Sequence, residues 1–536
     1  DELLKQSGTY RENEKTVERA MDSNDIERER GITILAKTTS VEWNGYRINI
    51  VDTPGHADFG GEVERILQMV DGAIVLVDAS EGPMPQTKFV VSKALKVGLR
   101  PIVAVNKIDK PERRPDEVIN EVFDLFANLD ATDEQLDFPI LYGSAKQGWM
   151  NTDYENPTTD MDALFQMVVD HVPTPKVEEG PFRLLATTIS SDPFLGRILT
   201  GRVSLAGMTK ANVADTFCDP SVTIPIEAQA IDPPTISMTF RVNDSPLAGT
   251  EGTKVTSRII WARLLKEAEG NVALKVDRAT DAEAFTVSGR GELQLAVLIE
   301  TMRREGFELG VSRPQVVMQE GPNGEKLEPI EEVTIDVDDD HSGIVVQKLS
   351  ERKADMLDMR PSGVGRTRMV FHAPTRGLIG YQGELLSDTR GTAIMNRVFH
   401  EYAPHKGRIQ GRHTGVLIAM EQGEAVAFAL WNLEDRGPMV IHPGDKVYAG
   451  MIIGEHNRDN DLEVNVLKGK KLTNMRASGT DEAVRLTPPL QMTLEKSLAY
   501  IADDELVEVT PSNIRMRKIY LDPHERKRHA KSNADH

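Results

Sequence analysis

The residues best suited to chemistry form the segment Asn106-Lys107-Ile108-Asp109, which follows the apolar run Ile102–Val105. Guanine presents a ring N–H and an exocyclic amino group side by side, and one carboxylate, that of Asp109, can accept both hydrogen bonds. Adenine lacks this pair of donors, and a site built around such bonds rejects the wrong base by roughly 10⁴–10⁵. We expect Lys107 to lie over the face of the base and Asn106 to tie neighbouring loops together. The segment therefore predicts a guanine-binding site.

A second strand end is expected to complete the base site. Residues Phe138–Tyr142 have the pattern of a strand, and Ser144, Ala145 and Lys146 follow it closely. Ligands of open parallel sheets bind at the carboxyl ends of the strands. We therefore expect backbone N–H groups of these three residues to face the guanine carbonyl oxygen. The alternative for Asn106–Asp109 is an ordinary charged strand end, which the two similar apolar runs before it, Ile48–Val51 and Ala73–Val77, disfavour.

Phosphate chemistry is indicated by the segment Asp52-Thr53-Pro54-Gly55, which closes another apolar run. An acidic residue at a strand end can hold Mg²⁺ through water, and a glycine lets its backbone N–H approach a γ-phosphate closely. The hydroxyl of Thr33 can reach the same metal. Since Mg²⁺ keeps several waters and takes phosphate oxygens as ligands, few protein ligands are needed. We expect Thr33 and Asp52 to bind the metal.

His56 directly follows Gly55, where a residue that orients an attacking water is needed. A single histidine is more often structural than catalytic, but this position favours a catalytic role. Phosphoryl transfer leaves the protein mainly positioning and charge stabilisation to supply. We expect His56 to align a water molecule for in-line attack on the γ-phosphate.

The phosphate loop that such a site needs does not occur, because no GxxxxGK[ST] segment is found in the 536 residues. One explanation is a degenerate nucleotide-binding protein. The other, which we expect, is that the first strand and loop of the domain precede Asp1, because the chain opens without methionine in what reads as the following helix.

The N-terminal elements are predicted to position these residues. Residues 1–21 read as a helix, and Asp22–Arg30, which offers no apolar face, as a mobile loop. Strands at Ile48–Asp52, Ala73–Asp78 and Ile102–Asn106 alternate with helices that have apolar stripes. This alternation with short connections requires right-handed crossovers and a parallel sheet.

Beyond a proline-rich linker the pattern becomes β-like, and two later segments repeat the order β-α-β-β-α-β of the split βαβ arrangement. The β-like part is short for a closed barrel, which suggests that internal sequence is missing near Gly207. We expect a multidomain α/β and α+β protein with these parts: a P-loop-type GTPase domain without its first strand (1–175), an incomplete β-barrel (181–232), two ferredoxin-like domains (233–325 and 326–403) and a β-rich C-terminal domain with a basic tail (404–536).

Composition narrows the class of protein. The single cysteine, Cys218, excludes an intramolecular disulfide and a cysteine-based metal cluster and fits a reducing cytoplasm. No apolar run approaches the roughly 18–20 residues that span a bilayer, so no membrane contact is expected. The net charge of −21 argues against nonspecific nucleic-acid binding by the whole surface. Two basic segments, Val464–Thr480 and Arg515–Lys531, depart from that average and are candidates for local nucleic-acid contacts. The alternative is that the first is a solvated loop and the second a solvated tail. We expect a monomer.

The chain resembles the translational GTPases of the elongation-factor family, and within them the ribosome-associated BipA (TypA) family. The segments that are similar are Asp25–Ile34, Val51–Phe59, Glu81–Thr87, Ser288–Leu293, Arg376–Gly380 and Gly469–Gly479. A LepA-like elongation factor has a similar domain order, but Glu81–Thr87 and Gly469–Gly479 argue against it. The resemblance covers essentially the whole chain.

The resemblance implies hydrolysis of GTP to GDP with Mg²⁺, with His56 as catalytic residue. It implies nucleotide contacts at Thr33, Asp52, Gly55, Asn106, Lys107, Ile108, Asp109, Ser144, Ala145 and Lys146. It also implies binding of the 70S ribosome and roles in translation regulation, ribosome assembly and stress response. Contacts to rRNA and tRNA are then expected from Lys468, Lys470, Lys471, Asn474, Arg476 and Ser478. The alternative is a ribosome- or RNA-binding module in which nucleotide acts as a latch without hydrolysis.

Overall fold

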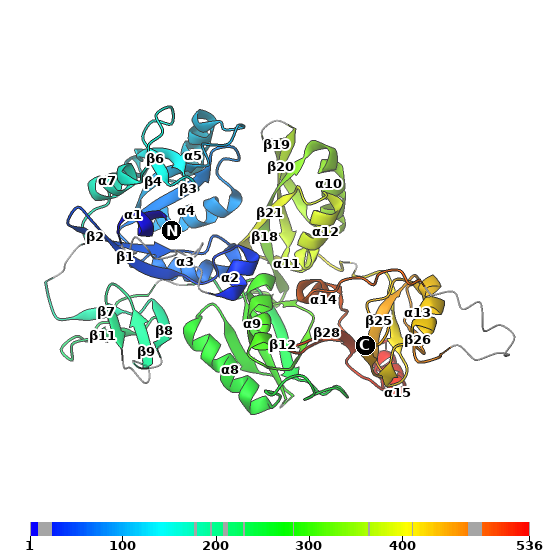
Figure 1. Cartoon of the computed structure of the whole chain (residues 1–536). Coiled ribbons are helices and arrows are strands. Elements are labelled where there is room, and N and C mark those ends of the chain that lie inside the picture. Colours follow the sequence, from blue (N-terminus) through cyan, green and yellow to red (C-terminus); the bar gives the residue numbers. More distant parts are fainter. Residues whose placement is uncertain are drawn as a thin grey trace.

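The computed structural model describes residues 2–8, 24–175, 179–192, 194, 196–206, 213–228, 231–281, 283–362, 365–409, 411–469 and 485–534. An N-terminal α/β unit, a small β unit, two ferredoxin-like units and a C-terminal unit lie around the buried helix α9 (Glu292–Arg304) and its neighbours (Figure 1). No helix among these residues is long and apolar enough to cross a membrane.

The N-terminal unit is built on a sheet with the order β3-β4-β5-β6, in which β3, β4 and β5 are parallel. Its strands are β3 (Gly72–Asp78), β4 (Arg100–Asn106), β5 (Ile140–Ser144) and β6 (Trp149–Asn151), and its larger helices are α3 (Gly60–Ile66), α4 (Pro85–Lys96), α5 (Pro115–Asn128) and α7 (Asp162–His171). Ile102, Val103, Ala104 and Val105 of β4 are all fully buried. Alternate residues of β4 belong to two separate cores, because the side chains of a strand point to opposite faces.

The strand that ends at Asp52 departs from the prediction. It forms β2 (Tyr46–Asp52), which pairs antiparallel with β1 (Lys37–Trp43) in a separate two-stranded sheet. No described strand joins β2 to β3, and Ile74 and Leu76 of β3 are 42% and 59% exposed. The predicted single parallel sheet that includes the Asp52 strand is therefore wrong for the described residues.

The predicted mobile loop at Asp22–Arg30 is also wrong where the structure describes it. Residues Asp25–Arg30 form helix α2, which has a capping box between Asn24 and Glu27 and ends at Gly31 with φ 69°. Ile26 is 3% exposed and packs with Ile34, Phe59 and Val297. The caps satisfy both helix ends, and one apolar side chain is enough to fix the helix to the core.

The predicted N-terminal helix is shorter than expected within the described residues. Helix α1 spans Glu2–Gln6 and is followed by a turn with φ 74° at Gly8. Residues 9–23 lie outside the described part.

The small β unit has two separate sheets. One contains β8 (Thr188–Asp192), β9 (Gly196–Thr200) and β10 (Ser204–Ala206), and the other pairs β7 (Arg183–Leu185) with β11 (Thr216–Cys218). The described strands do not close a barrel, which agrees with the prediction of an incomplete one. The region after Ala206 where sequence was predicted to be missing, residues 207–212, is not described.

Both predicted β-α-β-β-α-β segments form ferredoxin-like units. The first contains β12 (Ile236–Val242), α8 (Ser257–Gly270), β13 (Lys275–Arg278), β14 (Ala284–Gly289), α9 and β15 (Leu309–Ser312). The second contains β18 (Lys326–Asp338), α10 (Ser342–Glu351), β19 (Asp355–Pro361), β20 (Arg366–Pro374), α11 (Thr375–Leu378), α12 (Tyr381–Asp388) and β21 (Ile394–Pro404). Each sheet has its four antiparallel strands in the same order, β13-β14-β12-β15 and β19-β20-β18-β21.

The C-terminal unit continues the first ferredoxin-like sheet. Strand β15 pairs antiparallel with β27 (Glu505–Val509), and the sheet then runs through β28 (Ile514–Lys518), β25 (Met451–His456), β22 (Gly415–Ala419) and β26 (Leu462–Val464). One hydrophobic core contains Phe240 and Leu309 from the ferredoxin-like unit and Leu498 and Val507 from the C-terminal unit. The sequence predicts a helix at Leu494–Ile501, and the structure has helix α14 (Leu494–Tyr500) there. The unit also contains helices α13 (Ala427–Leu433) and α15 (Pro523–Ala534) and a small sheet of β23 (Gly423–Glu424) and β24 (Lys446–Val447).

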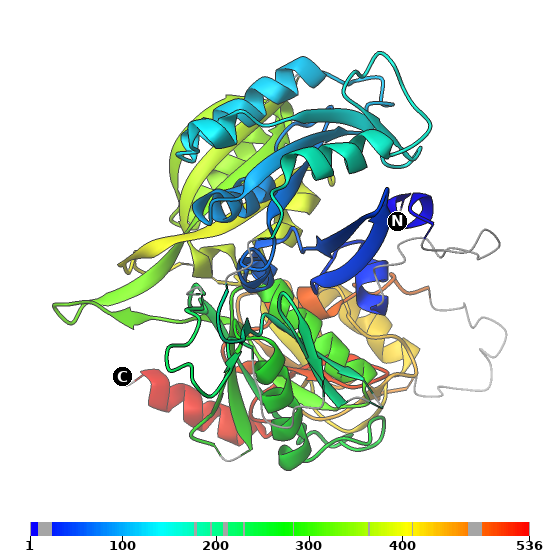
Figure 2. The same cartoon turned by 90° about the vertical axis from the view of Figure 1, so that its left-hand side faces the viewer.

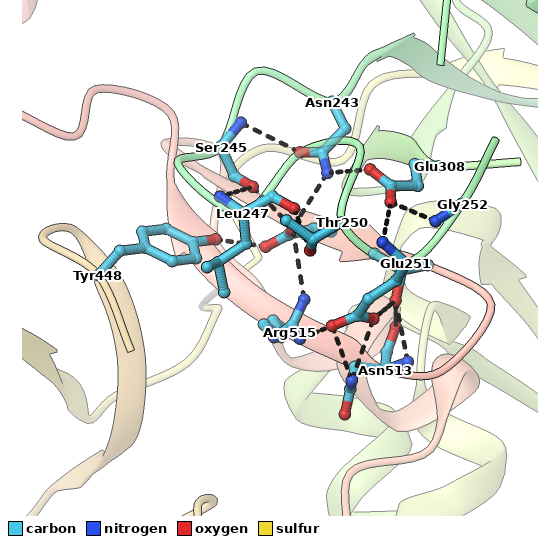
Figure 3. Close-up of polar contacts among 12 residues, drawn as sticks. Asn243, Ser245, Leu247, Thr250, Glu251, Gly252, Glu308, Tyr448, Asn513 and Arg515 are labelled. Atoms are coloured by element: carbon cyan, nitrogen blue, oxygen red, sulfur yellow. Dashed lines mark hydrogen bonds and ion pairs between the residues drawn. The ribbon is translucent and has the colours of Figure 1, made fainter. Parts of the chain in front are cut away.

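A buried polar network closes the joint between these two units (Figure 3). The carboxylate of Glu508 is fully buried and accepts hydrogen bonds from Asn243 (3.0 Å), Ser245 (2.7 Å) and the Tyr448 hydroxyl (2.5 Å). Fully buried Glu308 accepts bonds from backbone N–H groups of the loop that follows Ser245, at 2.6–3.1 Å. These donors satisfy the oxygens of both buried carboxylates, and the resulting network fixes the surrounding geometry.

Candidate nucleotide-binding site

The predicted guanine loop and the loop after β5 are joined by one side chain. The Oδ1 atom of Asn106 accepts hydrogen bonds from the backbone N–H groups of Lys107 (2.8 Å) and Ala145 (2.9 Å). The N–H of Ile108 donates to the Gly143 carbonyl oxygen at 3.1 Å, and the Ile108 side chain is buried in the core. These contacts hold the ends of β4 and β5 side by side, as the parallel register of the two strands requires.

Asp78, the last residue of the strand predicted at Ala73–Asp78, does more than end that strand. Its carboxylate lies 2.7 Å from Nζ of Lys107 and 3.2 Å from Nζ of Lys110, and it accepts hydrogen bonds from Ser80. Burial alone would raise the pKa of Asp78, but the hydrogen bonds from Lys107 and Ser80 hold that pKa well below its usual range. Asp78 therefore stays ionised and fixes Lys107, whose backbone has the uncommon φ of 63°.

The groups that remain for a ligand at this edge are few. Asp109 is exposed and has no hydrogen-bond or ion-pair partner among the described residues. Ser144 is 1% exposed and caps its own turn, since its Oγ accepts from the N–H of Gln147 at 3.3 Å. Because the N–H of Ala145 is already donated to Asn106, the predicted contact from Ala145 to a guanine oxygen is not available in this conformation. The exposed segment at Lys146 is the part left to supply it.

The predicted phosphate end is organised by Glu27, which sequence reasoning missed. Its fully buried carboxylate forms an ion pair with Lys37 (2.5 Å) and accepts hydrogen bonds from the N–H groups of Ile34 (2.9 Å) and Leu35 (3.1 Å). Burial would raise the pKa of Glu27, but these partners lower it overall. Half-buried Thr33 directly precedes this anchored segment, and Lys37 faces Asp52 in the β1–β2 register. The signal that identifies Glu27 is its place at the third position of a capping box.

His56 is placed by the turn that follows Gly55. It caps the short helix η1 (Ala57–Phe59), and its Nδ1 accepts a hydrogen bond from the N–H of Asp58 at 3.3 Å. With Nδ1 as acceptor, the neutral imidazole carries its proton on Nε2. The His56 side chain is 27% exposed, so that it is reachable by solvent while its backbone is held.

The loop of His56 is fixed from outside the N-terminal unit. Asp58 is 4% exposed, and its Oδ2 accepts a hydrogen bond from the N–H of Leu293 at 2.9 Å, in the first turn of α9. A carboxylate at this position is favoured by the helix dipole. A Cβ added at Gly291 would lie 2.1 Å from the Asp58 carboxylate, so only glycine allows this approach. The position of His56 therefore depends on the first ferredoxin-like unit.

The second ferredoxin-like unit closes the same junction. Arg397 lies 3.5 Å from Glu292 and 3.6 Å from Glu331, and burial raises the pKa of Glu331 while Arg397 opposes the increase. A cavity of about 30 Å³ is lined by Ala57, Asp58, Phe89, Arg290, Glu331 and Arg397, among others. Because ligand pockets usually measure about 300–1,000 Å³, this cavity has room for water and not for a nucleotide.

The predicted site residues thus fall into two groups. The ends of β3, β4 and β5 bring together Asp78, Asn106, Lys107, Asp109 and Ser144. The second group, Thr33, Asp52, Gly55 and His56, lies on the segment after α2, on the β1–β2 hairpin and on the turn before η1. Of the predicted RNA contacts only Lys468 is described, and it is exposed; Lys470, Lys471, Asn474, Arg476 and Ser478 lie outside the described residues.

Family models match most of the chain. The elongation factor Tu GTP binding domain matches residues 1–174, the elongation factor G C-terminus matches residues 325–413, and the TypA/BipA C-terminal domain matches residues 414–523.

Several curated proteins are similar over nearly their whole length. The large ribosomal subunit assembly factor BipA of Escherichia coli (strain K12) is 51% identical over 578 residues, covering 98% of this chain and 95% of that protein. The proteins of the same name from Haemophilus influenzae and Buchnera aphidicola are 48% and 47% identical, with 98% of this chain covered in each case. Since 578 aligned residues exceed the 536 of this chain, the relative contains internal residues that this chain lacks.

A crystal structure of a protein from Thermus thermophilus shares the fold. It has a TM-score of 0.50 at 14% identity, covering 76% of this chain and 94% of the other.

Proposed function

Because the chain belongs to the TypA/BipA family of translational GTPases, we propose that it hydrolyses GTP to GDP and phosphate when it is bound to the ribosome. The observation that supports this most directly is the arrangement of the predicted guanine-binding residues at the carboxyl ends of β3, β4 and β5. Asn106 clamps the two loops, Asp78 fixes Lys107, and the Asp109 carboxylate is left exposed. This arrangement leaves a single acceptor for the paired donors of guanine.

The metal is proposed as Mg²⁺ held by Thr33 and Asp52. The described residues contain no group of three His, Cys, Asp or Glu side chains that could hold a metal alone. A site with one hydroxyl and one carboxylate fits Mg²⁺, which completes its shell with water and phosphate oxygens. When bound, the ion would neutralise charge on the phosphate oxygens.

His56 is proposed to orient the attacking water. Its Nδ1 is engaged by the Asp58 N–H and its side chain is 27% exposed, so Nε2–H is the group that can hold a water in place. The ribosome would act by fixing the His56 side chain, whose backbone is already held, and a partner that completes such a site can add roughly 10³–10⁵ to the rate.

The partner is proposed to be the 70S ribosome, through its rRNA and bound tRNA, in the cytoplasm. The curated relatives are named large ribosomal subunit assembly factors, which supports a role in ribosome assembly. Roles in translation regulation and stress response are part of the same proposal.

Phosphate release from GTP, measured with and without ribosomes, tests the proposed activity. The rate should rise sharply with ribosomes, and His56→Ala should keep nucleotide binding while losing about 10²-fold or more of the stimulated rate. His442→Ala, a change of an exposed histidine in the C-terminal unit, serves as the control. Equal stimulation of the His56 variant would remove His56 from this role.

Base selection is tested separately by Asp109→Asn. An amide cannot accept both guanine hydrogen bonds, so the affinity for GTP should fall. Xanthosine triphosphate has an oxygen in place of the amino group, so its affinity should increase relative to that of GTP. Competition between the two nucleotides for the full chain measures the change. An unaltered preference would contradict the assignment of Asp109.

A binding module that uses nucleotide only as a latch is the second candidate. It is favoured by the lack of a GxxxxGK[ST] segment in the 536 residues. Sedimentation with ribosomes in GTP, in GDP and without nucleotide distinguishes the two. Binding that is the same in all three conditions, without phosphate release, would favour the module.

A further inference from the structure

Helix α15 (Pro523–Ala534) has three of its four Lys and Arg side chains, those of Lys527, Arg528 and Lys531, on one face. His524, Lys527, Arg528 and Lys531 are exposed and stand at positions i, i+3, i+4 and i+7. Residues with this spacing lie along one side of an α-helix, and with a rise of 1.5 Å per residue they extend over about 10 Å. Figure 2 shows the helix (red) at the edge of the molecule.

The other face fixes the helix to the C-terminal unit. Asp522 caps its start by accepting from the N–H groups of His524 (2.8 Å) and Glu525 (3.0 Å). Arg526 forms an ion pair with Glu463 of β26 at 2.8 Å and donates to the Leu521 carbonyl oxygen at 2.6 Å. The rings of Tyr520 and His529 stack with 3.9 Å between their centroids. The cationic face is therefore held in a defined orientation.

The basic residues of the Arg515–Lys531 segment divide into two kinds. Arg515, Arg517, Lys518 and Arg526 are each paired with a carboxylate. Lys527, Arg528 and Lys531 have no carboxylate partner among the described residues, although the protein has a net charge of −21. The charges of the first four are therefore neutralised by carboxylates within the protein. The last three remain without an ion-pair partner among the described residues, in a protein whose net charge is −21.

We propose that the face formed by Lys527, Arg528 and Lys531 binds the phosphate backbone of double-helical RNA. Cations aligned along a helix neutralise phosphates and release counterions, which provides affinity without sequence readout. A membrane surface is a poorer partner, because a helix that lies on lipid needs an apolar face and α15 has only Pro523, Ala530 and Ala534 as apolar residues. The helix lies almost wholly beyond residue 523, where the matched TypA/BipA C-terminal domain ends.

That this RNA is ribosomal rests on the proposed function. In that setting α15 would add a contact that is separate from the predicted contacts at Lys468–Ser478. Its anchor, Glu463, lies on β26, the strand at whose end the basic segment Val464–Thr480 begins.

The test compares two triple variants of the full chain. One is Lys527→Ala with Arg528→Ala and Lys531→Ala. The control is Lys96→Ala with Arg258→Ala and Lys266→Ala, which removes the same charge from exposed helical positions without ion pairs in the described structure. Binding of a labelled RNA duplex of about 20 base pairs, slightly longer than the roughly 16 that one double-strand-binding domain spans, is followed by fluorescence anisotropy between about 50 and 200 mM salt.

The α15 variant should bind about 10- to 100-fold more weakly at low salt, and the slope of log K against log salt should become shallower by about 2–3, roughly 0.9 for each phosphate contact. The control should match the unmodified chain. Equal losses in both variants, or no loss in the α15 variant, would overturn the proposal. A loss confined to vesicles that contain phosphatidylserine, with RNA binding unchanged, would also overturn it in favour of a membrane.

Phosphate release with ribosomes, measured on the same proteins, separates the two proposals. A chain that shows no ribosome-stimulated hydrolysis, but whose RNA binding depends on α15, would contradict the proposed function alone. Normal stimulation together with unchanged RNA binding in the α15 variant would contradict the RNA contact alone.

Discussion

At the scale of one residue, the ion pair with Asp78 fixes the position of the Lys107 side chain, which we expect to lie over the face of the base. The 2.7 Å ion pair raises the pKa of Lys107 and leaves both groups charged at neutral pH. Asp78→Asn should release Lys107 and weaken binding of a fluorescent GTP analogue about tenfold, the scale of one hydrogen bond to a charged group. Glu81→Gln, a change of an exposed carboxylate in the same loop, should have little effect. Equal losses from both changes would show a general charge effect.

Glu27 makes the segment before Thr33 sensitive to acid. Its folded pKa lies below the ordinary value of 4.5, so its contribution to stability is present above pH 4.5 and is lost as the pH falls through the folded value. Glu27→Gln should destabilise this segment by about 3 kcal/mol at pH 7, since it leaves Lys37 without its buried partner. Limited proteolysis within residues 24–35 measures the change.

Glu29→Gln is the control for that prediction. The Glu29 side chain is 60% exposed in its pair with Arg304, and exposed pairs contribute little to stability. Proteolysis that is as fast in this variant as in Glu27→Gln would contradict the assigned role of Glu27.

Among the elements, the contact between η1 and α9 is the one that connects the His56 loop to the rest of the molecule. Gly291→Ala would place a Cβ 2.1 Å from the Asp58 carboxylate, so the hydrogen bond from Leu293 should break. The expected result is a loss of ribosome-stimulated hydrolysis with unchanged affinity for the GTP analogue. Hydrogen exchange at the first turn of α9 should also become faster.

Gly383→Ala provides the matched control in α12. A Cβ there meets nothing within 4 Å, and alanine is preferred to glycine inside a helix by about 1 kcal/mol. This variant should be slightly more stable and fully active. If Gly291→Ala behaved in the same way, the contact would have no part in the activity.

The elements predicted well from sequence are those with sustained periodicity. Both β-α-β-β-α-β segments and α14 were predicted with their strands and helices in order, because apolar residues recur with the period of each element. Within the second segment, the sequence favours a helix over the whole of Ser342–Leu357, but helix α10 ends at Glu351 and an exposed strand, β19, begins at Asp355. Met356 and Leu357 are apolar side chains of the kind that a buried helix contains, but here they are exposed. The segment is a strand because it pairs with β20, and the sequence alone does not show this pairing.

Helix α2 shows why a capped helix can be mistaken for a loop. Six residues with one buried apolar side chain give no periodic signal. What fixes the helix is the capping box and a partner, Val297, that lies far away in sequence. At the base site, the polar residues at the strand ends were identified from sequence, but the role of Asp78 was not. Its ion pair with Lys107 joins two loops, and it can be predicted only if β3 and β4 are known to be neighbours.

For the whole molecule, the joint of Figure 3 predicts that the first ferredoxin-like unit and the C-terminal unit unfold together. Glu508→Ala would leave Arg515, Asn243 and the Tyr448 hydroxyl without their buried acceptor, which should cost about 3–5 kcal/mol. In scanning calorimetry one shared transition should split into two. Glu421→Ala, a change of an exposed carboxylate of the C-terminal unit, should leave the transition unchanged. A single transition at an unaltered temperature in Glu508→Ala would contradict this coupling.

The pairing of β15 with β27 also has a consequence for the timing of folding during synthesis. Strand β15 ends at Ser312 and its partner begins at Glu505, so about 190 residues must be made before the partner exists. At about 5–20 residues per second this takes roughly 10–40 s. Throughout this interval the edge of β15 has unpaired N–H and C=O groups, a state that favours pairing with other chains. The nascent chain is therefore exposed to aggregation through β15 in the period between completion of the first ferredoxin-like unit and synthesis of β27.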